Sequence, residues 1–372
     1  MRVHQNLYDK NLKLALFLKF LKDDSGIILF VVLGILVVLS LLVVGVGRRT
    51  SIEMILTKHT LGKLRSKYIA VAGLVYSMDQ LIQDINDKEL SQFDNRFQCG
   101  YRLSEGEIPE DIFKDVKVKD GSFGIFYLSQ ENEEKPKLHY GFQDEESKIN
   151  INALTHQNYK FLTQLLLQLG YAEDLSETIA SSVVDWRDEN KDVFNHPYGA
   201  EEDYYLSLEN PYPCKNQAFD SIEELLLIKG MTPEIFDDLK DSVTIFPKNG
   251  RFLVNLDTAS RETLQAIARS YTGPKTNTDI VDADSLVKKM LSYRGGDDEV
   301  EGTSDDRPLD FNKMGLNAKE MVLFLLMDQE RTKISNYLRV RIKGFDDQTK
   351  VTSLIEAVIY RGDLSIVYWH RS

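Results

Sequence analysis

The densest group of side chains that could do chemistry lies in residues 185–205, "DWRDENKDVFNHPYGAEEDYY". The first three candidates alternate as D-x-N-x-D, the spacing of the first oxygen ligands in many calcium loops. Three acidic residues after the Pro-Tyr-Gly turn could fold back to complete an oxygen shell. The six candidate ligands are Asp188, Asn190, Asp192, Glu201, Glu202 and Asp203. The stretch therefore predicts a calcium site, with a solvated acidic loop as the alternative.

The calcium loop would not be an EF-hand. Val193 stands where that motif has Gly, and Gly199 stands where it has the bidentate Glu. A second acidic stretch, 295–306, is rich in Gly and Ser and is interpreted as a flexible loop.

The sequence contains no recognisable catalytic set. It has no G-x-S-x-G, H-E-x-x-H or P-loop motif, and its six histidines are scattered. The formal net charge is -13, which repels phosphate backbones and argues against nucleic acid as a partner. We expect a protein that is not an enzyme. Cys99 and Cys214 leave two alternatives, one disulfide or two free thiols.

The chain contains one long apolar run that could anchor it in a membrane. Ile27 to Val46 is a stretch of 20 residues without a charge, about the 30 Å thickness of a bilayer core as a helix. It is too long for the apolar part of an ordinary secretory signal. No second run of this length follows, so the sequence predicts a single membrane anchor that carries a large soluble part.

The segment before the anchor is a polar leader that ends at Gly26. This arrangement resembles the class III signal of type IV pilins and pseudopilins, which prepilin peptidase cuts after Gly at the cytoplasmic face. The resemblance implies that Gly26 and Ile27 flank the cleavage site and that Ile27 is the mature N-terminus. The sequence departs from that class at Ser25, where a basic residue is usual.

The fold class follows from the two ends of the soluble part. Apolar residues recur at helical spacing after Arg49, which predicts one helix from Ile27 to near Asp87. Alternating runs at 337–342, 351–360 and 364–369 predict antiparallel strands, separated by turn signals at 343–347 and 361–363. Residues 121–131 and 136–146 predict a further hairpin. We expect an α+β, pilin-like core in which the long N-terminal helix packs on an antiparallel sheet.

The middle of the chain reads as helical and as an insertion between strands of this core. Predicted helices cover 159–169, 176–185, 222–228, 233–239, 261–268, 284–292 and 318–327, with Ser176, Ser221 and Ser260 as caps. Residues 148–166 and 252–268 look alike and indicate two similar units. Residues 219–246 predict a helix-hairpin-helix element. Its acidic second helix indicates a role in packing rather than in phosphate binding.

Read together, the motifs resemble one family, the general secretion pathway protein K family, the large minor pseudopilins of type II secretion systems. The resemblance rests on "DEESKININAL", "VVDWRDEN", "YGAEEDYYL", "FDSIEELLLIKGMTPEIFDDL", "VNLDTAS" and "LRVRIKGF…SLIEAVIYR" in that order. It implies a pilin-like core with a large inserted α-helical domain, in which members of the family bind calcium.

The family resemblance, added to the patterns above, predicts the organisation of the chain. We expect a leader (1–26), a transmembrane segment (27–46), a first part of the core (47–145), an inserted α-helical domain (146–331) and C-terminal strands (332–372). The insertion would contain two SAM-like or helix-hairpin-helix-like units. The fifth mature residue is Val31, where most pilins have Glu. A subunit with no neighbour above it has no amine to neutralise that Glu, so its absence is typical of a tip subunit.

The predicted function is that of a minor pseudopilin that caps the periplasmic pseudopilus and nucleates its assembly for export of folded proteins. Expected partners are the I- and J-type minor pseudopilins, prepilin peptidase, the Gram-negative inner membrane, and secreted substrates or the outer-membrane secretin. A minor pilin of a type IV pilus, for adhesion or DNA uptake, is the first alternative. A membrane-anchored hydrolase that uses the acidic cluster as a metal site is the second.

Overall fold

The computed structural model describes residues 19, 24–86, 93–97, 108–129, 137–303 and 305–371. It divides into two compact units, Met1–Leu64 and Arg65–Ser372. Most of the leader and Cys99 lie outside the described residues. The cleavage after Gly26 and the two alternatives for the cysteines therefore stay predictions.

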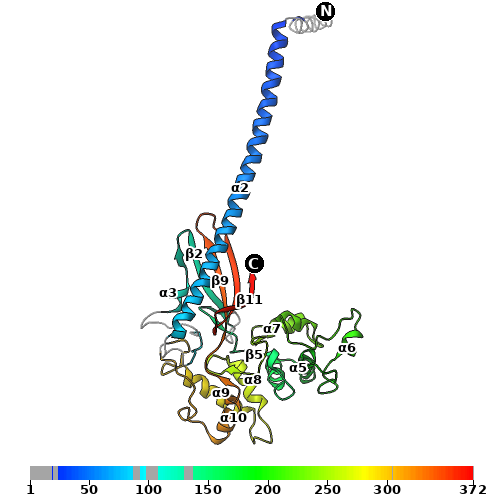
Figure 1. Ribbon diagram of the computed structural model, residues 1–372, viewed down its shortest axis with the longest axis vertical. Coiled ribbons are helices and arrows are strands. Elements are labelled where there is room, and N and C mark those ends of the chain that lie inside the picture. The colour runs from blue at the N-terminus through cyan, green and yellow to red at the C-terminus, as the bar shows by residue number, and fades with distance from the viewer. Residues whose placement is uncertain are drawn as a thin grey trace, which may run out of the picture. The chain divides into compact units, whose positions relative to one another are not determined.

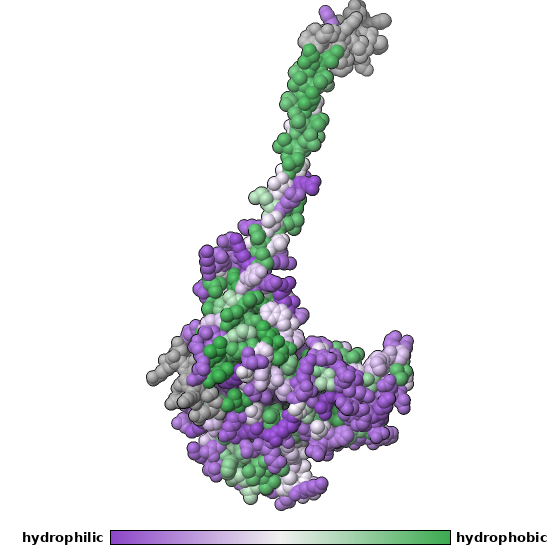
Figure 2. All heavy atoms as spheres, in the orientation of Figure 1, coloured by the Kyte–Doolittle hydropathy of each residue, from purple (hydrophilic) through white to green (hydrophobic). Residues whose placement is uncertain are grey.

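The first unit is the apolar start of one long helix, α2 (Asp24–Asn86). The helix ends close to the predicted Asp87, so the expected continuous helix is confirmed. Apolar side chains from Ile27 to Val46 are exposed on every side of the helix, and Figure 2 shows those on one face in green. Among the described residues, α2 is the one helix long and apolar enough to cross a membrane. An exposed apolar surface of this extent requires a lipid environment or partner helices.

The second unit is built on a seven-stranded antiparallel sheet (Figure 1). Its main order is β1 (Val116–Val118), β2 (Gly121–Ser129), β9 (Tyr337–Asp346), β10 (Thr352–Tyr360) and β11 (Ser365–Arg371). Strand β3 (Lys137–Tyr140) pairs with β2, and β4 (Gln143–Asp144) pairs with β9. A short helix, α3 (Pro109–Phe113), precedes β1. The predicted hairpin and C-terminal strands are present, and the α+β class is confirmed.

The second half of α2 covers one face of this sheet. Its buried positions Ile69, Ala70, Leu74 and Leu81 recur at helical spacing and form a core with the inward side chains of the strands. The helix approaches the sheet most closely at Gly344 of β9, where a Cβ would lie 2.6 Å from the backbone nitrogen of Ala70. Glycine at this position permits the contact.

The segment between β4 and β9 is mainly helical and has its own core. Its first half comprises β5 (Ile149–Asn150), η2 (Ile151–Ala153), α4 (Lys160–Gln168), α5 (Glu173–Arg187), α6 (Glu202–Leu206), η3 (Ile222–Leu227), α7 (Pro233–Leu239) and β6 (Val243–Thr244). Its second half comprises β7 (Val254–Asn255), α8 (Arg261–Ser270), α9 (Ile280–Arg294), α10 (Ala318–Asp328) and β8 (Arg331–Thr332). In each half the first strand pairs in parallel with the last.

The similarity between the two halves extends to individual side chains. The side-chain oxygen of Asn150 accepts from the backbone N–H two residues later at 2.9 Å, and that of Asn255 does the same at 3.1 Å. At the end of α5, Arg187 donates to the carbonyl of Asn152 at 2.8 Å. At the end of α9, Arg294 donates to the carbonyl of Leu256 at 2.9 Å. The two look-alike segments therefore share these contacts, although residues 151–153 form a 3₁₀ helix and residues 256–258 form a turn.

Three local predictions need correction. Ser176 does not cap a helix, because α5 already begins at Glu173 and the Ser176 hydroxyl donates to the carbonyl of Ala172 within it. The helix expected at 222–228 is a 3₁₀ helix. The turn expected at 343–347 is wrong, because β9 continues to Asp346. Gly344 serves the close approach of α2, so it is not a turn signal.

Candidate functional site

The predicted calcium ligands lie between α5 and α6, and the structure brings only some of them together. Asp188 follows the last residue of α5, and Glu201 precedes the first residue of α6. Glu201 is 3% exposed, and neither of its carboxylate oxygens has a hydrogen bond of normal geometry, although the Cys214 thiol lies close enough to affect its pKa. One carboxylate oxygen of Asp188, Oδ2, is also buried without a hydrogen bond and lies 3.4 Å from His156 Nε2. Asp188 and Glu201 are thus two neighbouring carboxylates with few donors or cations to balance their negative charge.

Burial and mutual repulsion dominate the electrostatics of the cluster. Burial, together with the negative charge of Asp188, raises the pKa of Glu201 to about 7. Burial likewise raises the pKa of Asp185 to about 7, although its oxygens accept from the backbone N–H groups of Phe194 at 2.9 Å and Ala200 at 2.7 Å. Asp185 thereby holds the loop in place. A cation between Asp188 and Glu201 would relieve the repulsion.

Of the remaining predicted ligands, Glu202 and Asp203 line a pocket with Glu201, whereas Asn190 and Asp192 lie in turns. Asn190 donates its backbone N–H to Asp188, and its own side chain accepts from the N–H of Asp192 at 2.7 Å, so these residues form successive turns. Glu202 and Asp203 lie in the first turn of α6. Within the described ranges, no three His, Cys, Asp or Glu side chains are arranged to hold a metal ion.

A lysine from the helix-hairpin-helix element fixes the same loop. The Lys229 ammonium donates to the carbonyls of Pro197, Tyr198 and Gly199 at 3.2, 3.0 and 3.0 Å. Lys229, Pro197 and Gly199 line an open pocket of about 350 Å³ together with Glu201. Sequence reasoning missed both Asp185 and Lys229. The available signal for Asp185 was an acidic residue placed directly after the apolar pair Val183-Val184.

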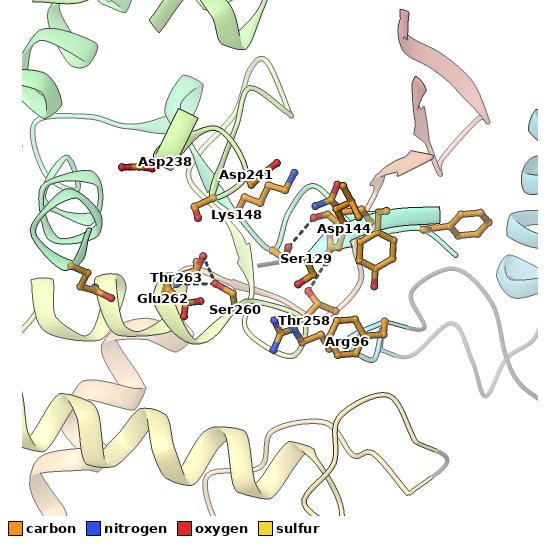
Figure 3. A pocket seen from close by; sticks show the side chains of 18 of the residues that line it. Arg96, Ser129, Asp144, Lys148, Asp238, Asp241, Thr258, Ser260, Glu262 and Thr263 are labelled. Carbon is orange, nitrogen blue, oxygen red and sulfur yellow. Dashed lines mark hydrogen bonds between the residues drawn. The ribbon is translucent and has the colours of Figure 1, made fainter. Parts of the chain in front are cut away.

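A second polar site lies where the core meets the inserted helices (Figure 3). Asp144 accepts from the hydroxyls of Thr258 and Ser335 and from the backbone N–H of Glu146. These bonds link β4 to the second half of the insertion through Thr258 and to the segment before β9 through Ser335. Burial raises the pKa of Asp144 to about 6. Burial and the negative charge of Asp144 raise the pKa of Glu146 to about 7.

The pKa of Glu145, which lies between Asp144 and Glu146, shifts in the opposite direction. Glu145 is buried but contacts Arg339 at 2.7 Å and Lys148 at 2.9 Å. These two cations outweigh the effect of burial and hold the pKa of Glu145 well below its usual range. A cavity of about 330 Å³ adjoins Asp144, and its lining also includes Lys148 and Glu262 (Figure 3). Its mixed charges and its hydroxyls suit water better than an apolar ligand.

An apolar stripe runs along the side of α2 that faces away from the sheet. Tyr68, Val75 and Ile82 are 62%, 61% and 42% exposed and are seven residues apart. Ala70, Leu74 and Leu81 on the opposite side are buried. A seven-residue repeat keeps side chains on one face of a helix, as in the seam between two packed helices. This surface fits a partner helix.

Comparisons with known proteins agree on one family. The family model for type II secretion system protein K matches residues 147–248, which cover the first half of the insertion. A type II secretion system protein K from Pectobacterium carotovorum subsp. carotovorum is 27% identical over 239 residues, 63% of this chain and 66% of that protein's own length. One from Aeromonas hydrophila is 24% identical over 256 residues, 67% of this chain and 72% of that protein.

The fold is also found among solved structures. A chain from the crystal structure of the GspK-GspI-GspJ complex of the enterotoxigenic Escherichia coli type 2 secretion system matches with a TM-score of 0.58 and 16% identity. The match covers 85% of this chain and 99% of that chain, so the shared architecture includes the insertion. The family model and both relatives therefore match the family that the sequence motifs indicated, protein K of type II secretion systems, and the solved structure shares the fold.

Proposed function

We propose that the chain is a minor pseudopilin of a type II secretion system that caps the tip of the pseudopilus and nucleates its assembly. It is a structural component rather than an enzyme. One helix anchors it in the inner membrane of a Gram-negative bacterium, and its soluble part lies in the periplasm. The likeness to protein K over the inserted helices and the apolar start of α2 support this proposal.

The observation that carries tip placement is the size of the insertion. Residues 145–336 separate β4 from β9 and form a second core beside the sheet. A fibre packed around its α2 helices has room for such a body at the end but not along the shaft. Val31, in place of the usual Glu, also supports tip placement. A tip subunit has no neighbour above it to pair with that Glu, and an unpaired carboxyl in a bilayer costs at least about 2.5 kcal/mol. Secreted substrates or the secretin would meet the inserted helices.

The proposed partners are the I- and J-type minor pseudopilins, by analogy with the complex of the solved relative. The exposed stripe of Tyr68, Val75 and Ile82 would pack against a partner's helix. We expect the full chain in detergent to co-purify with both subunits. Val75→Lys should weaken this association at least tenfold, because it places a charge in the contact between the two helices. Val281→Lys, at a more exposed apolar position on α9, is the matched control.

A wild-type chain that ignores both subunits would contradict the proposal, and equal association of the Val75→Lys variant would contradict the assigned seam. DNA retention by the soluble part would instead favour a minor pilin for DNA uptake.

Processing by prepilin peptidase forms part of this proposal. Cleavage after Gly26 would leave Ile27 as the first residue of the apolar helix. N-terminal sequencing of the chain from assembled fibres should read Ile27. A chain that still begins with Met1 in fibres would overturn the pilin-type assembly.

We also propose that calcium binds between Asp188 and Glu201. The unpartnered oxygens of Glu201 support this choice, since a buried carboxylate normally has a compensating charge or donor. Calcium would supply that charge and tie the end of α5 to the start of α6. Adding a chelator should lower the melting temperature of the wild type but not that of Glu201→Gln. An unchanged wild-type midpoint, with no ion in elemental analysis, would end the proposal.

A further inference from the structure

The two edges of the sheet differ in a way that the fold alone does not require. One edge consists of the short strands β1 and β3, which carry the exposed lysines Lys117 and Lys137. Short edge strands and lysines are how proteins prevent unwanted strand pairing. The other edge is β11, seven residues long, which pairs with β10 alone among the described strands. This edge has no lysine, and one register shift near its centre is the irregularity in its ladder.

The side chains of β11 are apolar at its centre. Ile366, Val367 and Trp369 are 41%, 41% and 43% exposed. The ladder with β10 shifts register between Val358 and Ile359, and from Tyr368 to Arg371 it is regular. The regular stretch therefore offers an uninterrupted row of backbone N–H and C=O groups to a further strand.

The apolar layer under α2 also continues into this edge. Trp369 lies opposite Ala357, a fully buried core residue, so both side chains are on the sheet face that α2 covers. Ala357 is covered, whereas Trp369 is left half-buried at the margin. Tyr368, on the other face, lies 5.4 Å from the Arg339 guanidinium. A strand added beside β11 would bury Trp369 and extend the core.

A second copy of the chain does not fit this edge. Antiparallel pairing of two β11 strands turns one second unit upside down, and α2 runs along the strands (Figure 1), so the two helices would point in opposite directions. Two chains anchored in one membrane point the same way. Parallel pairing keeps that direction but places Arg371 beside its own copy, and like charges at facing positions are destabilising.

We propose that β11 is the docking edge for an extended strand of a different pseudopilin, which adds to the sheet next to Tyr368–Arg371. The partner strand would have β-branched or aromatic residues facing Trp369 and a carboxylate facing His370 or Arg371. This inference rests on the proposed function, because it takes the partner from the same fibre. It adds a contact between sheets to the proposed contact between the α2 helix and a partner's helix.

The test is amide hydrogen exchange on the full chain in detergent, alone and in complex with the I- and J-type subunits. We expect the outward amides of β11 to exchange at least tenfold more slowly in the complex, while those of β1 stay unchanged. Trp369→Lys should weaken association at least tenfold. Leu325→Lys on α10, where the native side chain is 48% exposed, is the matched control.

Arg371→Glu provides a second variant that leaves the apolar side chains intact. It should also weaken association, since it reverses the charge that faces the partner's carboxylate. A complex that forms without slower exchange in β11, or that tolerates both variants, overturns the docking edge and leaves the proposed function standing. If the outward amides of β11 are already protected from exchange in the chain alone, the edge pairs with a second copy, and the inference is also overturned. Failure of the wild type to bind either subunit would instead count against the proposed function.

Discussion

Arg361 is the residue on which several distant segments converge. Its guanidinium forms ion pairs with Asp84 of α2 and with Asp94, the latter at 3.0 Å, and it donates to the carbonyl of Ser335. All these charged side chains are buried, and burial lowers the pKa of Arg361 to about 10. Arg361 therefore ties the end of α2 to the segment before β9.

Replacing Arg361 should be severe. Arg361→Ala leaves two buried carboxylates without a cation, and we expect a loss of about 3–5 kcal/mol in the free energy of unfolding. Urea unfolding of the soluble part measures this loss. Lys240→Ala breaks an exposed ion pair with Asp237 and should change stability by less than about 1 kcal/mol. Similar values for the two variants would contradict the role given to Arg361.

At this scale the sequence predicted the acidic loop but not the roles within it. The D-x-N-x-D spacing singled out Asp188, whereas Asn190 and Asp192 form turns. Spacing along the chain cannot distinguish a ligand from a turn residue, because both use the same side-chain oxygens. The importance of Asp185 and Lys229 depends on contacts between distant segments, which no local pattern records.

Helices and strands with a strong period were predictable, and their ends were less so. The spacing of apolar residues located α2 and the three C-terminal strands, because each buries one face. The misread turn at 343–347 came from Gly344. In sequence, a glycine that allows close packing looks the same as one that allows a turn.

The packing role of Gly344 gives a test at the element scale. Gly344→Ala places a methyl group against the carbonyl of Ser66 and the backbone nitrogen of Ala70, and neither atom can move without shifting α2. We expect a loss of about 1–3 kcal/mol or more in the free energy of unfolding. Gly124→Ala on β2 meets its nearest atom, the carbonyl oxygen of Phe113, at 3.5 Å and should be far milder. Equal effects would show that the helix is not seated on β9 as described.

At the scale of the molecule, the junction between core and insertion should respond to pH. The pKa values of Asp144 and Glu146 are raised, to about 6 and 7, so the folded state binds more protons than the unfolded state between about pH 4 and 7. Stability therefore falls as pH rises through this window. Glu145, whose pKa is lowered, acts only below this range.

Glu146→Gln should remove part of this pH dependence. Since each unit of pKa shift is worth about 1.4 kcal/mol, we expect the difference in unfolding free energy between pH 5 and pH 8 to shrink by about 1–3 kcal/mol. Urea unfolding at several pH values measures it. Glu209→Gln, at an exposed position, should leave the dependence unchanged. An unaltered slope for Glu146→Gln would mean that this carboxyl is not held in a low-dielectric junction.

The central claim concerns where the chain stands in the assembled fibre. The proposal is that a body as large as the inserted helices, attached beside the sheet that α2 covers, fits at the end of a helical filament and not along its shaft. The most direct measurement is immunogold labelling of the inserted helices on isolated pseudopili. The account predicts one label at one end of each fibre, and labels repeated along the shaft would contradict it.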